Sequence, residues 1–170
     1  MKLILIAVVL ITQLLFFFQP SSGKIVRREI IPQEMTDRIL SYDYHIAMAA
    51  LEENRRQKNS QAVCLSLKHR SLVIRRLAAE ALGELQAKSS VQCLIEALEN
   101  NQTVLLGGSE TVIEQDMLNE AIIGATEKIT GLELKYKKSS PKKIDRVASR
   151  KQVRAALEKI KTWQTAQKEK

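Results

Sequence analysis

The sequence has few of the residues on which most catalytic and metal sites depend. Of its 170 residues, two are His and two are Cys, and aromatic residues make up 4%. Neither His45 nor His69 belongs to a metal-binding or nucleophile-base spacing such as H-E-x-x-H, and no C-x-x-C pair indicates zinc. Phosphate-binding glycine loops and the G-x-S-x-G motif are also absent. We therefore expect no catalytic residue, no metal and no cofactor, and a protein that is not an enzyme.

The composition excludes two further classes. Hydrophobic residues make up 45% and charged residues 27% of the chain, which fits neither a disordered protein nor one with many membrane spans. Ala, Leu, Ile, Glu, Lys, Arg and Gln dominate, and these residues lose little conformational freedom when they enter a helix. The composition predicts a single, soluble, helical domain.

The long apolar run of the sequence lies at its N-terminus. It extends over 16 residues, from Leu3 to Phe18, after Met1 and Lys2, and Pro, Ser and Gly follow it up to Gly23. This order is typical of a secretory signal that is cut after Gly23, and the run is shorter than the roughly 20 residues that cross a bilayer core. We expect a secreted or periplasmic protein without a membrane span after cleavage; the alternative is an uncleaved segment that anchors the chain in a membrane.

Export would place Cys64 and Cys93 in a compartment that permits disulfides. Both residues fall within apolar helical stretches, where a free Cys behaves as a small buried hydrophobic residue. We favour two free cysteines in the core, and a disulfide between Cys64 and Cys93 is the alternative.

An internal repeat runs through the middle of the chain. Residues 75–84 repeat residues 44–53 with a displacement of 31 positions, and residues 93–99 repeat residues 62–68 in the same register. Each copy has the apolar spacing of a short amphipathic helix. A fixed period of this length predicts stacked helical hairpins.

The third copy of the second helix, residues 118–126, comes 13 positions late, so residues 100–116 must contain an insertion. The insertion has Gly107 and Gly108 at its centre and the sequon-like residues 101–103 near its start. Insertions in repeat proteins often form loops on the binding face. We predict a loop here, either for binding or without a function, since a longer surface loop costs little free energy.

The residues from Ile74 to Leu85, followed by those from Val91 to Leu98, resemble the HEAT-like repeats named after phycobilisome lyases. In that family a Val-Arg pair opens the second helix, and Ala-Leu-Gly ends its apolar face. Arg75 stands at the Arg position. His69 and Ser71 stand where the family has the Asp that pairs with this Arg, so the resemblance does not extend to that ion pair.

This resemblance covers roughly residues 43–131 and implies an all-α fold, a short α-solenoid of HEAT-like helical hairpins. In such a stack small residues let neighbouring helices approach, and larger ones fill the space between layers. Similar proteins include bilin lyases and an iron-dependent hydroxylase, but the His-Glu pairs that would hold iron are absent here. The residues predicted for the repeat core are Ile74, Leu77, Ala78, Ala81, Leu82, Leu94 and Leu98.

Charge changes abruptly after residue 131. Residues 132–170 contain 13 Lys and Arg against 4 Asp and Glu, a net charge of +9, whereas residues 24–131 contain 13 against 15, a net charge of −2. We predict a basic loop at residues 135–143 and then a helix that Asp145 or Ser149 caps.

That C-terminal helix has an apolar stripe, which we expect to pack on the last repeat as a cap, with Trp163 as a packing anchor. The stripe consists of Val153, Leu157, Ile160 and Trp163. The outward cations are the candidate interaction residues, because a basic face can bind anionic partners or can simply be solvated. They are Lys135, Lys137, Lys138, Lys142, Lys143, Arg150, Lys151, Arg154 and Lys161.

These patterns divide the chain into a signal peptide (1–23), a repeat domain (24–131) and a basic loop with a C-terminal capping helix (132–170). Our leading hypothesis is an exported, non-enzymatic scaffold that binds a protein partner. The alternative is an electrostatic binder of anionic lipid or polysaccharide that uses the basic C-terminal segment, and the least favoured is a lyase-like enzyme. Export makes nucleic acid an unexpected partner.

Overall fold

The computed structural model describes residues 31–103, 109–137 and 146–169, and this part of the chain is helical without strands. The predicted all-α class is therefore confirmed. The helices are α2 (Gln33–Ile39), α3 (Tyr44–Arg56), α4 (Ser60–Ser66), α5 (Leu72–Leu85), the 3-10 helix η1 (Lys88–Ser90), α6 (Val91–Thr103), α7 (Ser109–Thr130) and α8 (Arg146–Lys168).

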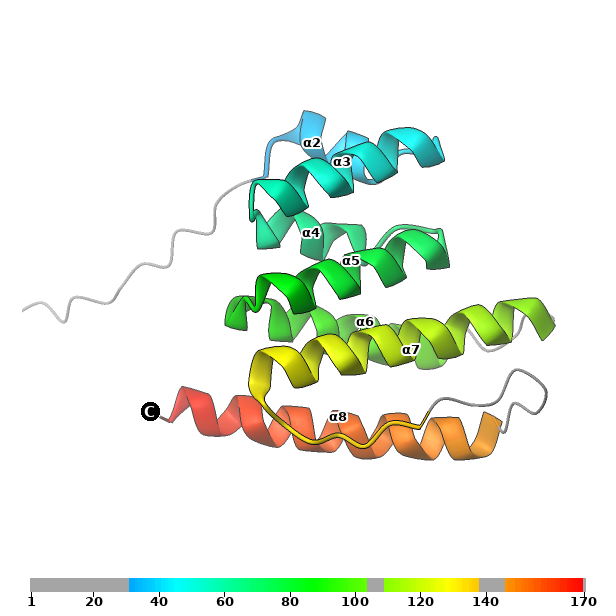
Figure 1. Cartoon of the computed structure of the whole chain (residues 1–170), viewed down its shortest axis with the longest axis vertical. Coiled ribbons are helices and arrows are strands. Elements are labelled where there is room, and N and C mark those ends of the chain that lie inside the picture. Colours follow the sequence, from blue (N-terminus) through cyan, green and yellow to red (C-terminus); the bar gives the residue numbers. More distant parts are fainter. Residues whose placement is uncertain (1–30, 104–108, 138–145, 170) are drawn as a thin grey trace, which may run out of the picture. The chain divides into compact units, whose positions relative to one another are not determined.

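Successive helices pair and lie one pair below another (Figure 1). One row contains α3, α5 and α7, and a second row contains α2, α4 and α6, with α8 after α6. The connection between α2 and α3 and the connection between α4 and α5 lie at one end of the stack, on the right in Figure 1. Among the described helices, α5 and α7 make the most extensive contact.

Local signals in the sequence explain where several helices begin and end. The Asp43 side chain accepts hydrogen bonds from the N–H groups of His45 (2.8 Å) and Ile46 (3.3 Å), which caps the start of α3. The Asn59 side chain caps α4 in the same way. Gly131 has a φ of 73° directly after α7, a conformation that Gly adopts without strain and that ends the helix.

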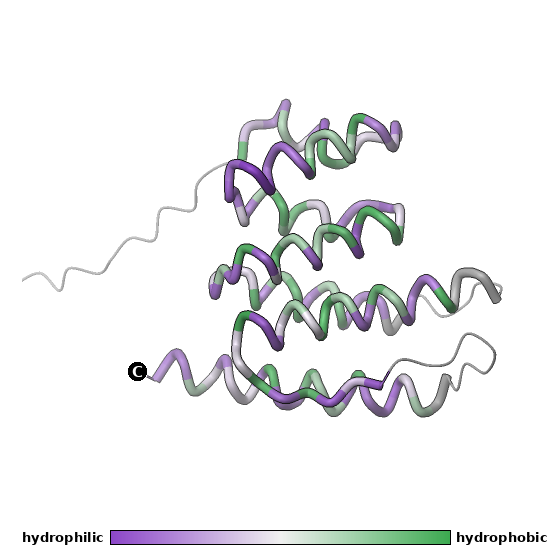
Figure 2. Tube along the Cα trace, in the orientation of Figure 1, coloured by the Kyte–Doolittle hydropathy of each residue, from purple (hydrophilic) through white to green (hydrophobic). Residues whose placement is uncertain are grey.

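The core lies between the two rows, and in Figure 2 apolar and polar residues alternate along each helix, as one-sided burial requires. Of the residues predicted for the repeat core, Leu77 is half-buried. The others are at most 3% exposed: Ile74, Ala78, Ala81, Leu82, Leu94 and Leu98. At Gly83 an added Cβ would lie 2.9 Å from the Cα of Ala125, so the close approach of α5 and α7 depends on this glycine.

The predicted loop at residues 100–116 is mostly helical, which corrects the sequence interpretation. Helix α6 continues to Thr103 and α7 begins at Ser109, so that only residues 104–108 lie outside the described part. The stretch after residue 109 contains Glu, Gln and Met, which favour helix, and Gln115 and Asp116 are buried. Most of the extra residues therefore lengthen α7, which has 22 residues, against 14 in α5.

The sequon-like Asn101 is buried inside the fold. It is 1% exposed, and its side-chain nitrogen donates to the backbone oxygen of Gln115 (3.1 Å) and to the side chain of Asn119 (2.8 Å). Asn101 thus connects α6 to α7, and the folded chain does not present its nitrogen to solvent.

The C-terminal helix packs as the apolar stripe predicts. Val153, Leu157 and Ile160 are at most 7% exposed, and Trp163 is partly buried against the same core. The predicted cap at Ser149 is wrong, because Ser149 lies within α8 and its hydroxyl donates to Asp116 of α7 (2.8 Å). Asp145, the other predicted cap, lies outside the described residues.

Candidate functional site

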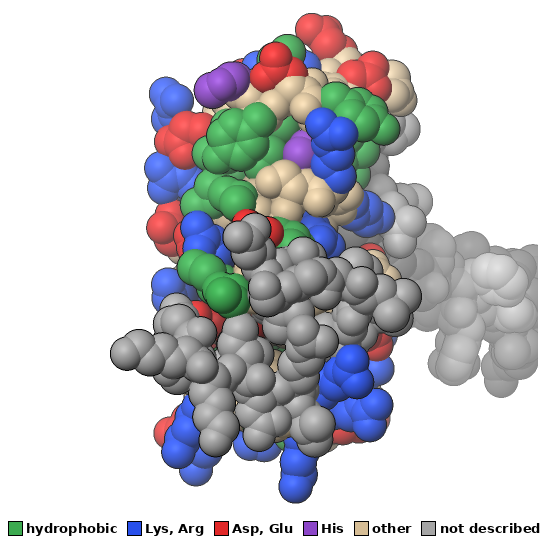
Figure 3. All heavy atoms as spheres, turned by 90° about the vertical axis from the view of Figure 1, so that its right-hand side faces the viewer, with side chains coloured by type: hydrophobic (Ala, Val, Ile, Leu, Met, Phe, Trp, Pro, Cys, Tyr) green, Lys and Arg blue, Asp and Glu red, His purple; other side chains and the backbone are tan. Residues whose placement is uncertain are grey.

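Four large apolar side chains are exposed where α2 connects to α3. The exposed fraction is 80% for Tyr42, 45% for Ile46, 44% for Tyr44 and 38% for Leu40. We name Leu40, Tyr42, Tyr44 and Ile46 the Tyr42 surface. Figure 3 shows apolar side chains over the upper part of this end of the stack. Isolated exposed apolar residues are ordinary, but a cluster with two tyrosines has the composition of a binding surface.

The connection between α4 and α5 holds the Tyr42 surface in place. The guanidinium of Arg70 lies 4.0 Å from the centroid of the Tyr42 ring, and its Nη2 donates to the backbone oxygen of Tyr42 (2.8 Å). One side chain thus fixes both the ring and the backbone of Tyr42. Because the ring remains largely exposed, the tyrosine is displayed in a fixed position rather than buried.

A buried histidine, His69, joins the same two connections. His69 is 3% exposed, and its Nδ1 accepts a hydrogen bond from the N–H of Ser71 (2.9 Å). Nε2 therefore carries the proton and donates it to the backbone oxygen of Ser41 (2.9 Å). The neutral ring connects the residue before Tyr42 to the start of α5. His45, in contrast, is exposed.

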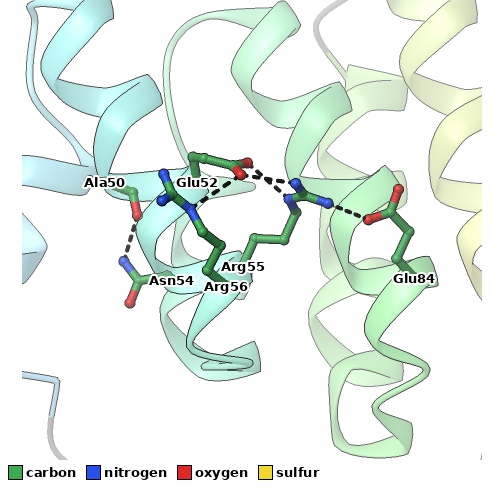
Figure 4. Close-up of polar contacts among 6 residues, drawn as sticks. All are labelled: Ala50, Glu52, Asn54, Arg55, Arg56 and Glu84. Carbon is green, nitrogen blue, oxygen red and sulfur yellow. Dashed lines mark hydrogen bonds and ion pairs between the residues drawn. The ribbon is translucent and has the colours of Figure 1, made fainter.

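A groove of about 250 Å³ lies between α3 and α5. Arg55 of α3 connects the two helices. Its Nε and Nη2 donate hydrogen bonds to the Glu52 carboxylate (2.9 Å each), and its Nη1 donates one to Glu84 of α5 (2.9 Å), as Figure 4 shows. These hydrogen bonds, led by the one with Glu52, raise the pKa of Arg55, and Arg55 in turn lowers the pKa of Glu52. The groove is lined by Met48, Leu51, Glu52, Arg55, Leu77, Glu80, Ala81 and Glu84.

The Tyr42 surface extends toward this groove. Tyr44 precedes Met48 by four residues on α3, and residues at this spacing lie on the same face of a helix. A partner that contacts Tyr44 can therefore also reach the apolar lining of the groove.

The two cysteines form a disulfide, whereas the sequence interpretation favoured free thiols. Cys64 of α4 and Cys93 of α6 are 29 positions apart, close to the repeat length, and their Cα atoms are 5.9 Å apart. The bond therefore joins two helices of the same row. Beside the bond, Arg75 lines a cavity of about 190 Å³.

In the described part of the chain, one nitrogen of the Arg75 side chain is left without a hydrogen-bond partner. Its Nε is buried and has no hydrogen-bond partner among the described residues, and burial lowers the pKa of its guanidinium. His69 and Ser71, which stand where the similar repeats have Asp, are hydrogen-bonded to each other, and His69 also bonds the backbone oxygen of Ser41.

The predicted basic residues separate into three groups. Lys138, Lys142 and Lys143 lie outside the described residues. Lys161 is bonded to Glu99 of α6 (2.7 Å), which raises the pKa of Lys161. The third group is exposed and has no ion-pair partner among the described residues: Lys135, Lys137, Arg150, Lys151 and Arg154.

A polar cluster that the sequence patterns did not reveal connects α7, the segment after it and α8. The hydroxyl of Tyr136 donates to Oδ1 of Asp116 (2.5 Å), and the hydroxyl of Ser149 donates to the same oxygen (2.8 Å). Burial, followed by the bond to Asp116, raises the pKa of Tyr136. Three elements far apart in the sequence converge on one carboxylate, so the cluster fixes α8 against α7.

Residues 31–103, 109–137 and 146–169 contain neither a metal-binding cluster nor a membrane-spanning helix. Their His, Cys, Asp and Glu side chains form no group of three or more that could hold a metal ion. No helix in these ranges has both the length and the apolar character to span a bilayer.

No protein-family model matches this chain, and no curated protein and no solved structure is significantly similar to it. We therefore infer a function from the surfaces of the protein itself.

Sequence reasoning missed the Tyr42 surface, although a signal was present. Two of the three tyrosines in the chain lie within three residues of each other, on either side of the helix-capping Asp43. Aromatic residues at a connection between helices are more often binding residues than those within a helix face.

Proposed function

We propose that the protein is an exported, non-enzymatic scaffold, a short HEAT-like α-solenoid with α8 as its cap, which binds a protein partner through the Tyr42 surface. The observation that carries the proposal is the exposure of Tyr42 and Tyr44 beside a connection that Arg70 and His69 hold in place through Tyr42 and Ser41. Tyr is enriched among residues that dominate binding energies, and a surface that is already ordered loses little entropy on binding.

Two features support the architecture and the export. Helices α4 and α6 begin 31 residues apart in the sequence and α3 and α5 begin 28 residues apart, which is close to the constant spacing that stacked repeats require. The disulfide between Cys64 and Cys93 is a feature of proteins that fold in oxidising compartments, in agreement with the apolar run from Leu3 to Phe18.

The test is a pull-down from the native secreted or envelope fraction, followed by an affinity measurement with the partner it recovers. We expect the double variant Tyr42→Ala, Tyr44→Ala to bind on the order of 10-fold to 100-fold more weakly, because truncating a central aromatic residue costs about 1 to 3 kcal/mol. The matched control is Ile113→Ala, which removes an apolar side chain that is 37% exposed on α7.

Both variants should keep the melting temperature of the unmodified chain, since the altered side chains are exposed. The proposal fails if the double variant recovers the same partner with the same affinity. It also fails if Ile113→Ala weakens binding as much as the double variant does.

A further inference from the structure

The outward side of α8 is strongly basic. The helix turns its apolar residues into the core, where Val153, Ala156 and Ile160 are 1% exposed, so its opposite side faces solvent at the last layer of the stack. In Figure 3, Lys and Arg side chains gather at the lower end of the molecule, where α8 lies. The exposed cations of α8 include Arg150, Lys151, Arg154, Lys159 and Lys161.

The contacts of these cations divide them into bound and free groups. Lys161 is bonded to Glu99, and Nζ of Lys159 donates to the backbone oxygen of Glu133 (3.2 Å). Arg150, Lys151 and Arg154 form no ion pair with any described residue. Arg150 and Arg154 are four residues apart, a spacing at which like charges destabilise a helix. The contacts of the described residues therefore do not explain why these three cations stand together.

Two more free cations lie beside them on a second segment. Lys135 and Lys137 are exposed in the extended segment before α8, and the N–H of Lys137 donates to the side chain of Gln152 in α8 (2.7 Å). This bond holds the segment along the N-terminal half of the helix. We name Lys135, Lys137, Arg150, Lys151 and Arg154 the basic face.

We propose that the basic face binds the surface of an anionic lipid bilayer. This goes beyond the proposed function, because it uses different residues at a different part of the molecule. The cations come from two adjacent segments, and positions 150, 151 and 154 lie on one side of an outermost helix, so a planar surface can contact more of them together than a single narrow polymer chain can. Each Lys or Arg near an anionic membrane adds to the attraction.

The binding must be electrostatic, since the apolar stripe of α8 is already used in the core and leaves nothing to insert. The sequence supplies a reason for the chain to meet a membrane. Its apolar run from Leu3 to Phe18 is directed to a bilayer, whether it is later removed or kept as an anchor.

The experiment measures binding of the full chain to vesicles of two compositions, phosphatidylcholine alone and phosphatidylcholine with one third phosphatidylglycerol. The quantity of interest is the ratio of the two partition coefficients, because any contribution of the apolar run is common to both. We expect the ratio to be well above one at low salt and to fall as the salt concentration rises. The triple variant Arg150→Gln, Lys151→Gln, Arg154→Gln should lower it about 100-fold, or about fivefold for each cation.

The matched control removes the same charge elsewhere. Lys58, Lys68 and Lys88 are exposed on other parts of the stack, and their replacement by Gln should leave most of the ratio intact. A charge-conserving variant, Arg150→Lys with Arg154→Lys, should bind anionic vesicles like the unmodified chain. Helical circular dichroism should be the same for all variants, because every altered side chain is exposed.

Three results would overturn the proposal: equal binding to both kinds of vesicle, an equal loss in the triple and control variants, or binding to soluble dextran sulfate without binding to phosphatidylglycerol. The last result would identify an anionic polysaccharide as the ligand instead. None of these results involves Tyr42 or Tyr44, so failure here leaves the proposed protein-binding function untouched.

Discussion

Helices α5 and α7 contact each other extensively, whereas α4 and α6 are joined by a disulfide beside a cavity of about 190 Å³. Both contacts connect the pair formed by α4 and α5 to the pair formed by α6 and α7. On the α5 side small residues allow a close approach, down to an added Cβ at Gly83 that would meet the backbone of Ala125 at 2.9 Å. On the α4 side the side chains leave space that the covalent bond spans.

From this difference we infer that the two rows are stabilised in different ways: the row with α5 and α7 by close packing, and the row with α4 and α6 by a covalent bond. Close packing gains dispersion energy and removes apolar surface from water. A disulfide acts mainly by restricting the unfolded chain and requires no dense contact around it. We therefore expect the row with α5 and α7 to depend on side-chain volume, and the row with α4 and α6 to depend on the redox state.

The largest effect that we expect comes from removing volume in the packed row. Leu82 of α5 is 0% exposed, and Leu82→Ala should lower the free energy of unfolding by ~2 to 5 kcal/mol, through lost transfer energy and a new cavity. Chemical denaturation measures this change. Leu77→Ala is the control, since Leu77 is only half-buried and should cost less. An unchanged denaturation curve for Leu82→Ala would show that the helix register is wrong.

Loss of the disulfide should come next. For a loop of 29 residues, chain entropy predicts a loss of about 3 to 4 kcal/mol on replacing Cys64 and Cys93 by Ala. Denaturation of the double variant and of the reduced, unmodified chain should give similar losses. A thiol count of two on the unfolded, unreduced protein would refute the bond itself.

A smaller effect concerns the polar cluster that fixes α8. Because the folded-state pKa of Tyr136 is raised, the folded protein keeps this proton above about pH 10, where the unfolded chain releases it. The resulting stability is present below that pH and is lost as the pH rises. Denaturation between pH 8 and 11 should show a decline that is weaker in Tyr136→Phe. Tyr44→Phe, on an exposed ring, should leave the decline unchanged.

Much of the helical arrangement was predictable, because burial imposes a period on the sequence. The displacement of 31 residues predicted that residues 44–53 and 75–84 are both helical, and they lie in α3 and α5; the apolar stripe with Trp163 indicated that α8 would pack on the core. The extent of α7 was not predicted. Gly107 and Gly108 indicate a break, but nothing in them shows that helix resumes at residue 109.

The candidate site was much less predictable, since its contacts depend on segments far apart in the sequence. Arg70 meets Tyr42 across 28 positions, and Asp116 meets Ser149 across 33. The burial of His69 likewise follows from the neighbouring connection rather than from its own helix. The exposed cations of α8 were predicted, because charge and helical spacing alone determine an outward face, but their division into bound and free groups was not.

Hydrogen exchange with and without a reductant tests most directly whether the two rows are held by different means. Reduction should speed the exchange of amides in α4 and α6 much more than in α5 and α7, because only the first two lose the bond that joins them. Two results would contradict this account. In the first, reduction leaves α4 and α6 as protected as before; in the second, α5 and α7 lose as much protection as α4 and α6 do.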